Sequence, residues 1–319
     1  MKQIRMPRTD LRPSVVCLGG GGVSEERSLF ACYDEYVERG GNCFDTANFY
    51  GREETGVNQH ERVLGRWLGQ KPPSFRDGVL ICTKGGHPLD GGHLDQPRLS
   101  REEVAADLDE SLKALGVEAV DLYWLHRDDP NRPVGEILSY LNEFCVQGKI
   151  RYFGASNWRA DRLREAETYA KANALPGFVA NQPQWSLAKA KQKVLDERTL
   201  VTMDAGAYQF HAGTGLTVMP YSPTAHGYFK KMLNHEPLDE YWAQTFDSPD
   251  NRRRLEAVKA IAQEKRCTVT QASLAWLLCQ PFPTIPVLGY SSREQLIENL
   301  GAVDVVLDHA VVQKLRGGK

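Results

Sequence analysis

The chain has 319 residues, with 41% hydrophobic and 25% charged side chains and a formal net charge of −2. That length fits two ordinary domains or one large α/β barrel, and either can bury a core that needs no disulfide or metal for stability. The near-neutral balance gives no general attraction to nucleic acid or to anionic membranes, so we expect neither as a partner. Seven cysteines without a Cys-x-x-Cys pair indicate neither a disulfide framework nor a zinc site.

The sequence contains no run that suggests targeting or a membrane span. Residues 1–10 lack the apolar core of a secretory signal, and no run of about 18 or more apolar residues could cross a bilayer. We therefore expect a cytoplasmic protein. The basic runs at 189–193 and 252–254 are short, and such runs are typically solvated faces of helices.

Short apolar runs alternate with stretches of helical periodicity along the whole chain. The apolar runs, which predict strands, are 14–20, 42–47, 78–86, 120–126, 150–156, 177–185, 215–223 and 284–291. Helical stretches follow the first five of them, at 24–40, 60–69, 100–116, 133–147 and 159–173. The third of these helices opens with a capping box, Ser100-x-x-Glu103, and ends at Gly116.

Eight strands alternating with helices favour a parallel sheet with crossover helices. At roughly 40 residues per unit, eight units account for the chain as one (β/α)8 TIM barrel, so a single domain over 1–319 is predicted. The alternative, a doubly wound Rossmann sheet, needs Gly-x-Gly-x-x-Gly after the first strand, but Ser24 stands at the last position. The connection after Tyr221 is longer than one unit requires, and we interpret 224–250 as a loop insertion at the barrel mouth that covers substrate or cofactor. A surface excursion with one short helix is the alternative for that segment.

Polar residues end several of the predicted strands, and in a barrel these ends converge on the face where chemistry takes place. Taken singly, an acid can be a turn former, a lysine can lie on the rim, and a histidine can be hydrogen-bonded in the core. Consecutive strands supply an acid, a lysine and a histidine, and a tyrosine follows the first of them: Asp45, Lys84, His126 and Tyr50. Later strands end in Ser156 with Asn157, Asn181 with Gln182, and Tyr221 with Ser222.

The first four residues form a chemically coherent set. A free tyrosine has a pKa near ~10, too high for efficient proton transfer at neutral pH, and a nearby ammonium lowers it by stabilising the phenolate. A buried carboxylate keeps that ammonium charged, and a neutral histidine can hydrogen-bond the same oxygen and align a carbonyl. The set therefore predicts a proton donor facing a carbonyl, which implies that hydride arrives from the other side.

Longer stretches extend this pattern to a known family. They include NCFDTANFYG (42–51), ICTKGG (81–86), LDESLKALGVEAVDLYWLHRDDP (108–130), GKIRYFGASNW (148–158), VANQPQWS (179–186) and IPVLGYSSREQLIEN (285–299). Together they resemble the aldo-keto reductase superfamily over nearly the whole chain. The resemblance implies a (β/α)8 barrel and an oxidoreductase that uses a nicotinamide cofactor, usually NADPH, on a small carbonyl or alcohol substrate.

The resemblance also implies roles for single residues. Tyr50 would donate the proton, and Lys84 would lower its pKa. Asp45 would pair with Lys84, and His126 would orient the carbonyl. The cofactor would be held by side-chain amides, a stacked tyrosine and the glycine-led turns, at Gly20, Gly21, Ser156, Asn157, Gln182, Tyr221, Ser222, Gly289, Ser291, Ser292, Arg293, Gln295, Glu298 and Asn299.

The turn at 289–299 bears on the choice of cofactor. It is led by glycine and brings two hydroxyls into a helix, a geometry that captures phosphate through backbone N–H groups. Arg293 is available for a 2′-phosphate, which favours NADP(H). That arginine lies one place later than in many relatives, and Tyr290 stands where a small residue is common, so NAD is the alternative cofactor.

The pocket wall is expected to include aromatic and polar neighbours of these residues: Phe49, His87, Arg127, Trp158 and Tyr228. Arg127 with Asp128 indicates a polar substrate.

Two other functions remain open. Lys84 at a barrel strand end could act as the Schiff-base lysine of a lyase. Some relatives are potassium-channel subunits, so a regulator that binds NADPH with slow or no turnover is the second alternative. A metal-dependent hydrolase built on 126–129 would need more His or carboxylate ligands than the strand ends offer, so no metal is expected.

Overall fold

The computed structural model describes residues 1–20, 25–88, 94, 96–196 and 198–317. Its centre is a sheet of eight parallel strands in the order β7-β6-β5-β4-β3-β2-β1-β8. The strands are β1 (Cys17–Leu18), β2 (Cys43–Asp45), β3 (Leu80–Gly85), β4 (Val120–Leu125), β5 (Ile150–Ser156), β6 (Ala180–Gln182), β7 (Thr217–Val218) and β8 (Val287–Leu288). Hydrogen bonds join the two ends of the sheet: the Ile285 N–H donates to Val218 O at 2.8 Å, and the Val287 N–H donates to Pro220 O at 2.9 Å. The predicted (β/α)8 barrel is confirmed.

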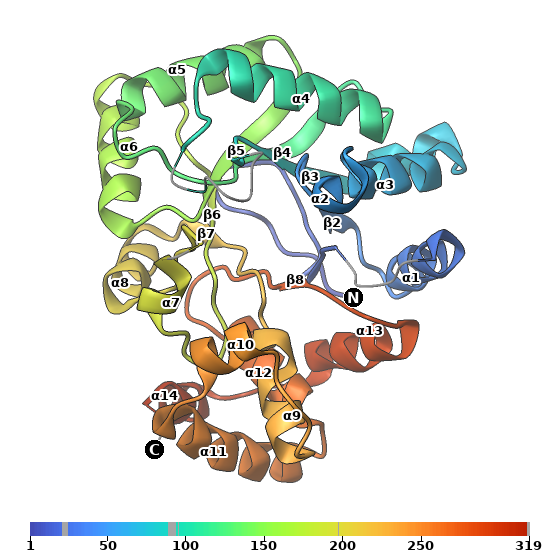
Figure 1. The fold of residues 1–319 in the computed structure, drawn as a ribbon, viewed down its shortest axis with the longest axis vertical. Helices are drawn as coiled ribbons and strands as arrows, with labels where there is room; N and C mark the ends of the chain where they lie inside the picture. Colours follow the sequence, from blue (N-terminus) through green and yellow to red (C-terminus); the bar gives the residue numbers. More distant parts are fainter. Residues whose placement is uncertain (21–24, 89–93, 95, 197, 318–319) are drawn as a thin grey trace.

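Helices alternate with these strands and surround them (Figure 1). The α-helices are α1 (Glu26–Glu38), α2 (Arg52–Thr55), α3 (Gln59–Gly69), α4 (Arg101–Leu115), α5 (Val134–Val146), α6 (Ala160–Ala172), α7 (Gln192–Asp196), α8 (Ala205–Thr214), α9 (Tyr228–Leu233), α10 (Glu240–Phe246), α11 (Pro249–Lys265), α12 (Val269–Leu278), α13 (Arg293–Leu300) and α14 (His309–Gly317). The 3-10 helices are η1 (Pro73–Gly78), η2 (Ala225–Gly227) and η3 (Gly301–Asp304). As predicted, α4 opens with the Ser100–Glu103 capping box and is closed by Gly116 at a φ of 67°.

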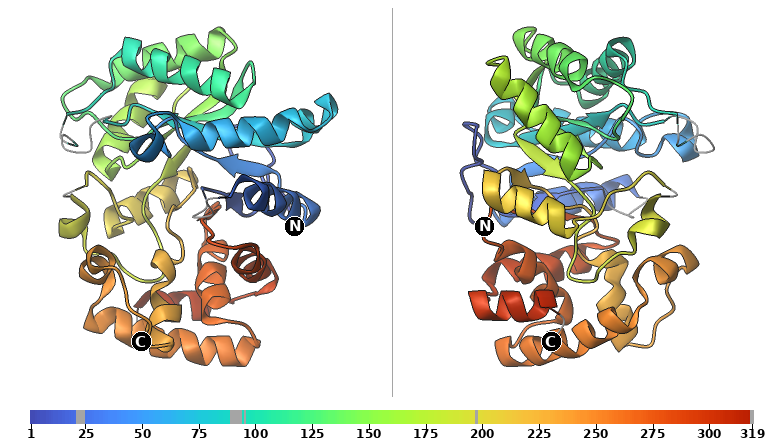
Figure 2. Two further views of the ribbon diagram at one scale, coloured as in Figure 1. Left: turned by 45° about the vertical axis from the view of Figure 1, so that its right-hand side comes forward. Right: turned by 90° about the vertical axis from the view of Figure 1, so that its left-hand side faces the viewer.

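The core lies in two layers, one inside the barrel and one between barrel and helices. The interior is filled by Met6, Leu11, Cys17, Cys43, Cys82, Leu122, Trp124, Val179, Ala180, Met219, Ile285 and Val287. Met6 and Leu11 belong to the N-terminal residues, which fold back through an antiparallel bridge between Gln3 and Ser14 and so place apolar side chains against the barrel interior. In the right-hand view of Figure 2 the N-terminal segment lies on the side of the molecule opposite to α9 and α10.

The segment 224–250 is largely helical, because it contains η2, α9, α10 and the start of α11. His226 adopts a φ of 54° in η2, and its ring stacks on Trp242 of α10 with centroids 3.5 Å apart. Tyr228 of α9 is 0% exposed and packs beneath the segment rather than facing outward. The stacked pair and this buried core hold the segment in a defined arrangement.

One basic run departs from the sequence interpretation. Residues 252–254 lie in α11, but the Arg254 side chain is 1% exposed, so the expectation of a solvated face is wrong at that position. Its guanidinium donates to Leu315 O and Arg316 O at 2.5 Å each, at the end of α14. Arg254 therefore satisfies main-chain carbonyls that a helix end leaves without partners.

Candidate active site

Four of the polar residues expected at the barrel mouth lie together. Asp45 ends β2, and its carboxylate forms an ion pair with the ammonium of Lys84 on the neighbouring strand β3. The Lys84 Nζ also donates to Thr46 O at 2.8 Å and to the Tyr50 hydroxyl at 3.3 Å. Tyr50 reaches this position because the loop after β2 turns back, with the Tyr50 N–H donating to Ala47 O at 3.1 Å. The strand ends and this turn thus place a phenol, an ammonium and a carboxylate in one row.

Burial and charge both act on Lys84. Its side chain is 1% exposed, and burial alone would lower the pKa of the ammonium. Asp45 and the Tyr50 phenol outweigh that effect and raise the Lys84 pKa above its ordinary value. Trp124 and Gln182 donate to the other carboxylate oxygen, Asp45 Oδ1, at 3.0 and 3.2 Å. Lys84 is therefore charged at neutral pH, and its partner is fixed from three sides.

His126 follows β4 and lies edge-on to Tyr50, with ring centroids 5.6 Å apart. Burial lowers the His126 pKa well below its ordinary value, and His87, Arg127 and Lys84 lower it further. Its Nδ1 is buried and has no hydrogen-bond partner among the described residues. A neutral imidazole therefore lies against the phenol.

A second neutral imidazole lies beside the first. The His87 ring centroid is 4.7 Å from that of His126, and its other side stacks on Phe49 at 3.8 Å. Burial lowers the pKa of His87 to about 3, with Arg127 acting in the same direction. Phe49 and His87 thus lie beside His126, whereas Trp158 is 1% exposed and packs in the core against Phe178.

The expected nicotinamide-binding side chains form one hydrogen-bonded group. Ser156 Oγ donates to Gln182 O at 2.9 Å, which ties the end of β5 to the end of β6. Asn157, at a φ of 61°, donates from Nδ2 to His126 O at 3.2 Å and accepts a hydrogen bond from the Tyr221 hydroxyl at 2.7 Å. Amide, hydroxyl and phenol groups therefore converge beside Asp45, Lys84, Tyr50 and His126, which we call the tetrad.

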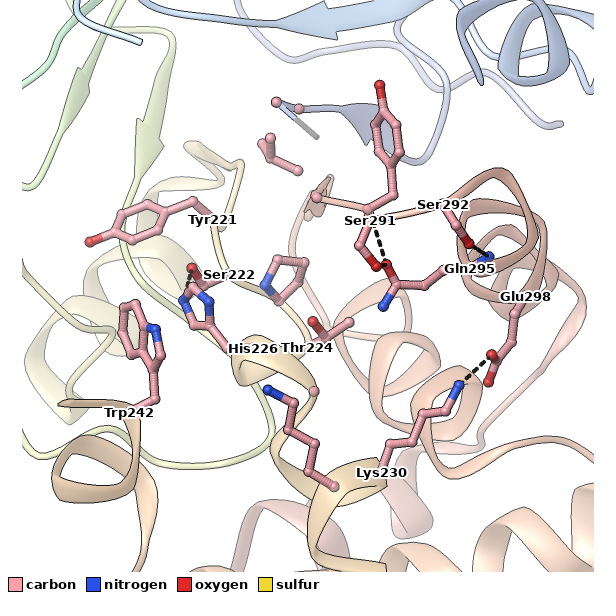
Figure 3. A pocket seen from close by; sticks show the side chains of 18 of the residues that line it. Tyr221, Ser222, Thr224, His226, Lys230, Trp242, Ser291, Ser292, Gln295 and Glu298 are labelled. Atoms are coloured by element: carbon pink, nitrogen blue, oxygen red, sulfur yellow. Dashed lines mark hydrogen bonds and ion pairs between the residues drawn. The ribbon is translucent and has the colours of Figure 1, made fainter. Parts of the chain in front are cut away.

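A cleft of about 1140 Å³ runs from the tetrad toward α13 (Figure 3). Many of the residues expected to bind a cofactor line it: Gly20, Tyr221, Ser222, Gly289, Ser291, Ser292, Gln295 and Glu298, together with Asp45 and Tyr50. Arg293 and Asn299 do not line it, and neither do Ser156, Asn157 and Gln182. The Arg293 guanidinium binds Glu35 of α1 at 2.5 Å, and Asn299 is 3% exposed. Gly21 lies outside the described residues.

The donor set of the cleft fits a dinucleotide. One wall includes Tyr50 and Tyr221, and the hydrogen bond from the Tyr221 hydroxyl joins this wall to Asn157. The other wall is the start of α13, where Ser292 caps the helix by accepting from the Gln295 N–H at 3.1 Å. Lys230 and Lys231 of α9 supply positive charge between the walls. Lys230 reaches across to Glu298 at 2.8 Å, so α9 and α13 are joined over the cleft (Figure 3).

The cleft residues that the sequence analysis did not single out include three with aromatic rings, His60, His226 and Trp242. The His60 ring lies 5.9 Å from Tyr50, and burial lowers the pKa of its imidazole. His226 accepts or donates a hydrogen bond with Ser222 Oγ at 3.0 Å, and Trp242 stacks on it. The position of His60 directly after the Tyr50 loop was a usable signal. The other two belong to 224–250, whose internal packing no local pattern specifies.

The described part of the chain offers neither a metal site nor a membrane-spanning helix. No group of three or more His, Cys, Asp or Glu side chains there could hold a metal ion. None of the described helices is long and apolar enough to cross a membrane.

Comparison with known proteins places the chain in a family. The family model "Aldo/keto reductase family" matches residues 16–317. An uncharacterized oxidoreductase, YrpG, of Bacillus subtilis is 29% identical over 99% of this chain and 95% of its own length. A probable aldo-keto reductase 1 of Glycine max is 28% identical over 85% of this chain and 73% of its own. A probable voltage-gated potassium channel subunit beta of Arabidopsis thaliana is 31% identical over 89% of this chain and 83% of its own. With its barrel and strand-end site, the chain belongs to the aldo/keto reductase family of oxidoreductases.

Proposed function

We propose that the protein is an NADP(H)-dependent oxidoreductase that transfers hydride between nicotinamide and the carbonyl of an aldehyde, ketone or sugar, with Tyr50 as the proton donor. The observation that carries the proposal is the row Asp45–Lys84–Tyr50 beside the neutral His126, at one end of the cleft. The proposal agrees with the family match.

The chain's own residues handle the proton. The bound cofactor would supply a hydride to the carbonyl carbon. Tyr50 gives its hydroxyl proton to the carbonyl oxygen, and the Lys84 ammonium at 3.3 Å stabilises the phenolate that remains. The neutral His126 imidazole lies beside the same hydroxyl and aligns the carbonyl. Solvent then returns a proton to Tyr50, and the reverse sequence oxidises an alcohol.

The cofactor would lie along the cleft. Ser156, Asn157 and Gln182 would bind the carboxamide, and Tyr221 would stack on the ring and fix the face that delivers hydride. The start of α13 with Ser291 and Ser292 would take phosphate oxygens. Arg293 is paired with Glu35 and does not line the cleft, whereas Lys231 and Lys230, the latter paired with Glu298, do line it. NADP(H) is the proposed cofactor, with NAD as the alternative.

A regulator that binds NADPH without turnover is the second candidate, since relatives from Arabidopsis thaliana and Oryza sativa are named as probable potassium channel subunits beta. A Schiff-base lyase fits less well. Asp45 and the Tyr50 phenol outweigh the effect of burial and hold Lys84 as an ammonium with a raised pKa, and an ammonium has no lone pair with which to attack a carbonyl.

The test compares wild type with Tyr50→Phe, using NADPH oxidation with a panel of aldehydes, ketones and sugars. The Phe variant keeps the ring, and Lys84 keeps Asp45 and Thr46 O, so NADPH should still bind. Loss of the proton donor should lower kcat by about 100- to 10,000-fold. Tyr152→Phe is a matched control, because its hydroxyl binds Asp10 at the protein surface, and it should retain wild-type rates. Comparable turnover by Tyr50→Phe would refute the role of Tyr50, and wild type that binds NADPH but reduces no carbonyl would favour the regulator.

A further inference from the structure

Arg127 is a buried cation with which no carboxylate of the described residues is paired. It follows His126 at the end of β4, and the residue is 8% exposed. Its Nη1 donates to His126 O at 2.8 Å and its Nε donates to Thr199 Oγ1 at 2.9 Å. No described residue forms an ion pair with it, and none accepts a hydrogen bond from its Nη2. Keeping a guanidinium charged in such a place is costly unless an anion meets it.

The nearby carboxylates on the same loop are already used. Asp128 binds Arg162 at 3.1 Å, and Asp129 lies 3.7 Å from Arg132. Arg98, the other arginine beside His87, is paired with Asp107 at 3.2 Å. Arg98, Arg132 and Arg162 thus each have an acid as partner, whereas the hydrogen bonds that the described residues make with the Arg127 side chain all go to neutral oxygens.

Arg127 also lies with the residues that handle the carbonyl. Its charge lowers the pKa of both His87 and His126. Burial is the main cause that lowers the pKa of Arg127 itself, and the phenols of Tyr221 and Tyr50 act in the opposite direction. The guanidinium is therefore within electrostatic reach of both imidazoles and both tyrosines. Lys84 is the other cation in this group, and Asp45 already neutralises it.

We propose that Arg127 binds an anionic group of the substrate, so that the protein acts on small carbonyl compounds that carry a carboxylate or a phosphate. The planar guanidinium forms charge-assisted hydrogen bonds with either group. Two of its nitrogens are oriented by His126 O and Thr199, which leaves Nη2 for the ligand. This inference rests on the proposed reductase function and adds to it the class of substrate.

The experiment uses pairs of carbonyl compounds that differ in charge. 4-Carboxybenzaldehyde and 4-oxobutanoate are each measured beside their methyl esters, and glyceraldehyde 3-phosphate is measured beside glyceraldehyde, all with NADPH. Wild type should show a higher kcat/KM for the charged member of a pair. A preference in the carboxylate pairs indicates a carboxylate substrate, and a preference in the glyceraldehyde pair indicates a phosphate substrate. Arg127→Met should lower that kcat/KM by about 10- to 150-fold, mainly through KM, because a hydrogen bond to a charged group is lost. The neutral member should change by less than about threefold.

Two further variants separate recognition from a structural role. Arg127→Lys keeps the charge and should retain part of the preference for the anion. Arg132→Gln removes one positive charge from the same loop, where Arg132 is paired with Asp129 and Glu136, and should leave the preference unchanged. Equal kcat/KM for charged and neutral members in wild type, or an equal loss for both in Arg127→Met, would overturn the inference while leaving the reductase proposal intact. Failure of wild type to reduce any carbonyl would remove both.

Discussion

Replacement of Asp45 by Asn would break the buried ion pair while nearly preserving shape. The Asn side chain keeps an oxygen that can accept from Trp124 and Gln182, which bind Asp45 Oδ1. Its Nδ2 then faces the Lys84 ammonium, so that two donors point at each other. Because both side chains are buried, with 3% and 1% exposed, water does not compensate for the lost charge.

Removal of one partner from a buried ion pair costs about 3–5 kcal/mol of unfolding free energy. For 319 residues the entropy of unfolding is about 0.7 kcal/mol per kelvin, so Asp45→Asn should lower the Tm by about 4–7 °C. The sign of the pH dependence of stability follows from Lys84, whose folded-state pKa is raised above its ordinary value of 10.5. The contribution from the raised Lys84 pKa is complete below about pH 10.5 and is lost as the pH rises through the folded-state pKa.

The assay is thermal unfolding at pH 7, followed by circular dichroism, for wild type, Asp45→Asn, Lys84→Met and the double variant. The double variant leaves no unpaired charge, so it should be more stable than Asp45→Asn alone. A Tm for Asp45→Asn within about 1 °C of wild type, or additive losses in the double variant, would refute the coupling inferred from the contact.

Two other predictions concern residues outside the tetrad. Burial raises the pKa of Glu61 to about 7, although hydrogen bonds from Thr83, Ser111 and Asn58 act to lower it. The ionised form of Glu61 is therefore disfavoured in the folded state. Wild type should lose about 2–3 kcal/mol of stability as the pH rises from about 4.5 to 7, and Glu61→Gln should lack this slope; parallel Tm–pH curves for the two proteins would contradict the prediction. Arg254→Leu removes the donors to Leu315 O and Arg316 O and should destabilise the protein by about 2–4 kcal/mol, with faster proteolysis near α14. Arg253→Leu, at a side chain that is 64% exposed, should change stability by less than about 0.5 kcal/mol, and equal effects of the two substitutions would count against the buried role of Arg254.

The strand ends show how much of the site can be predicted from sequence. Asp45 and Lys84 are far apart in the chain, yet the alternation of apolar runs places them on neighbouring strands, and the structure pairs them. The same rule gathers Ser156, Asn157 and Gln182. Parallel strands in a barrel end on one face whatever the details of packing, so a list of strand-end residues predicts which of them meet.

Arg293 is a residue whose partner the strand-end rule does not predict. Its place in a glycine-led turn indicated a phosphate ligand, but the side chain binds Glu35 because α13 packs against α1 across the junction of β8 and β1. Arg254 likewise differs from its sequence prediction, because α14 brings main-chain carbonyls into contact with its side chain on α11. In both cases the partner comes from a helix distant in sequence.

The sequence by itself determined the barrel, the order of its units and which residues stand at the strand ends. Strand periodicity and the polar residue at each strand end can be read locally. Closure of the sheet then brings these strand-end residues together on one face. Only the tertiary structure decided which charges have partners. Arg127 and Arg293 look alike in the sequence, but one lies buried without an acid and the other is paired with Glu35. The physical reason is that an ion pair depends on the packing of side chains from distant elements, about which local periodicity carries no information.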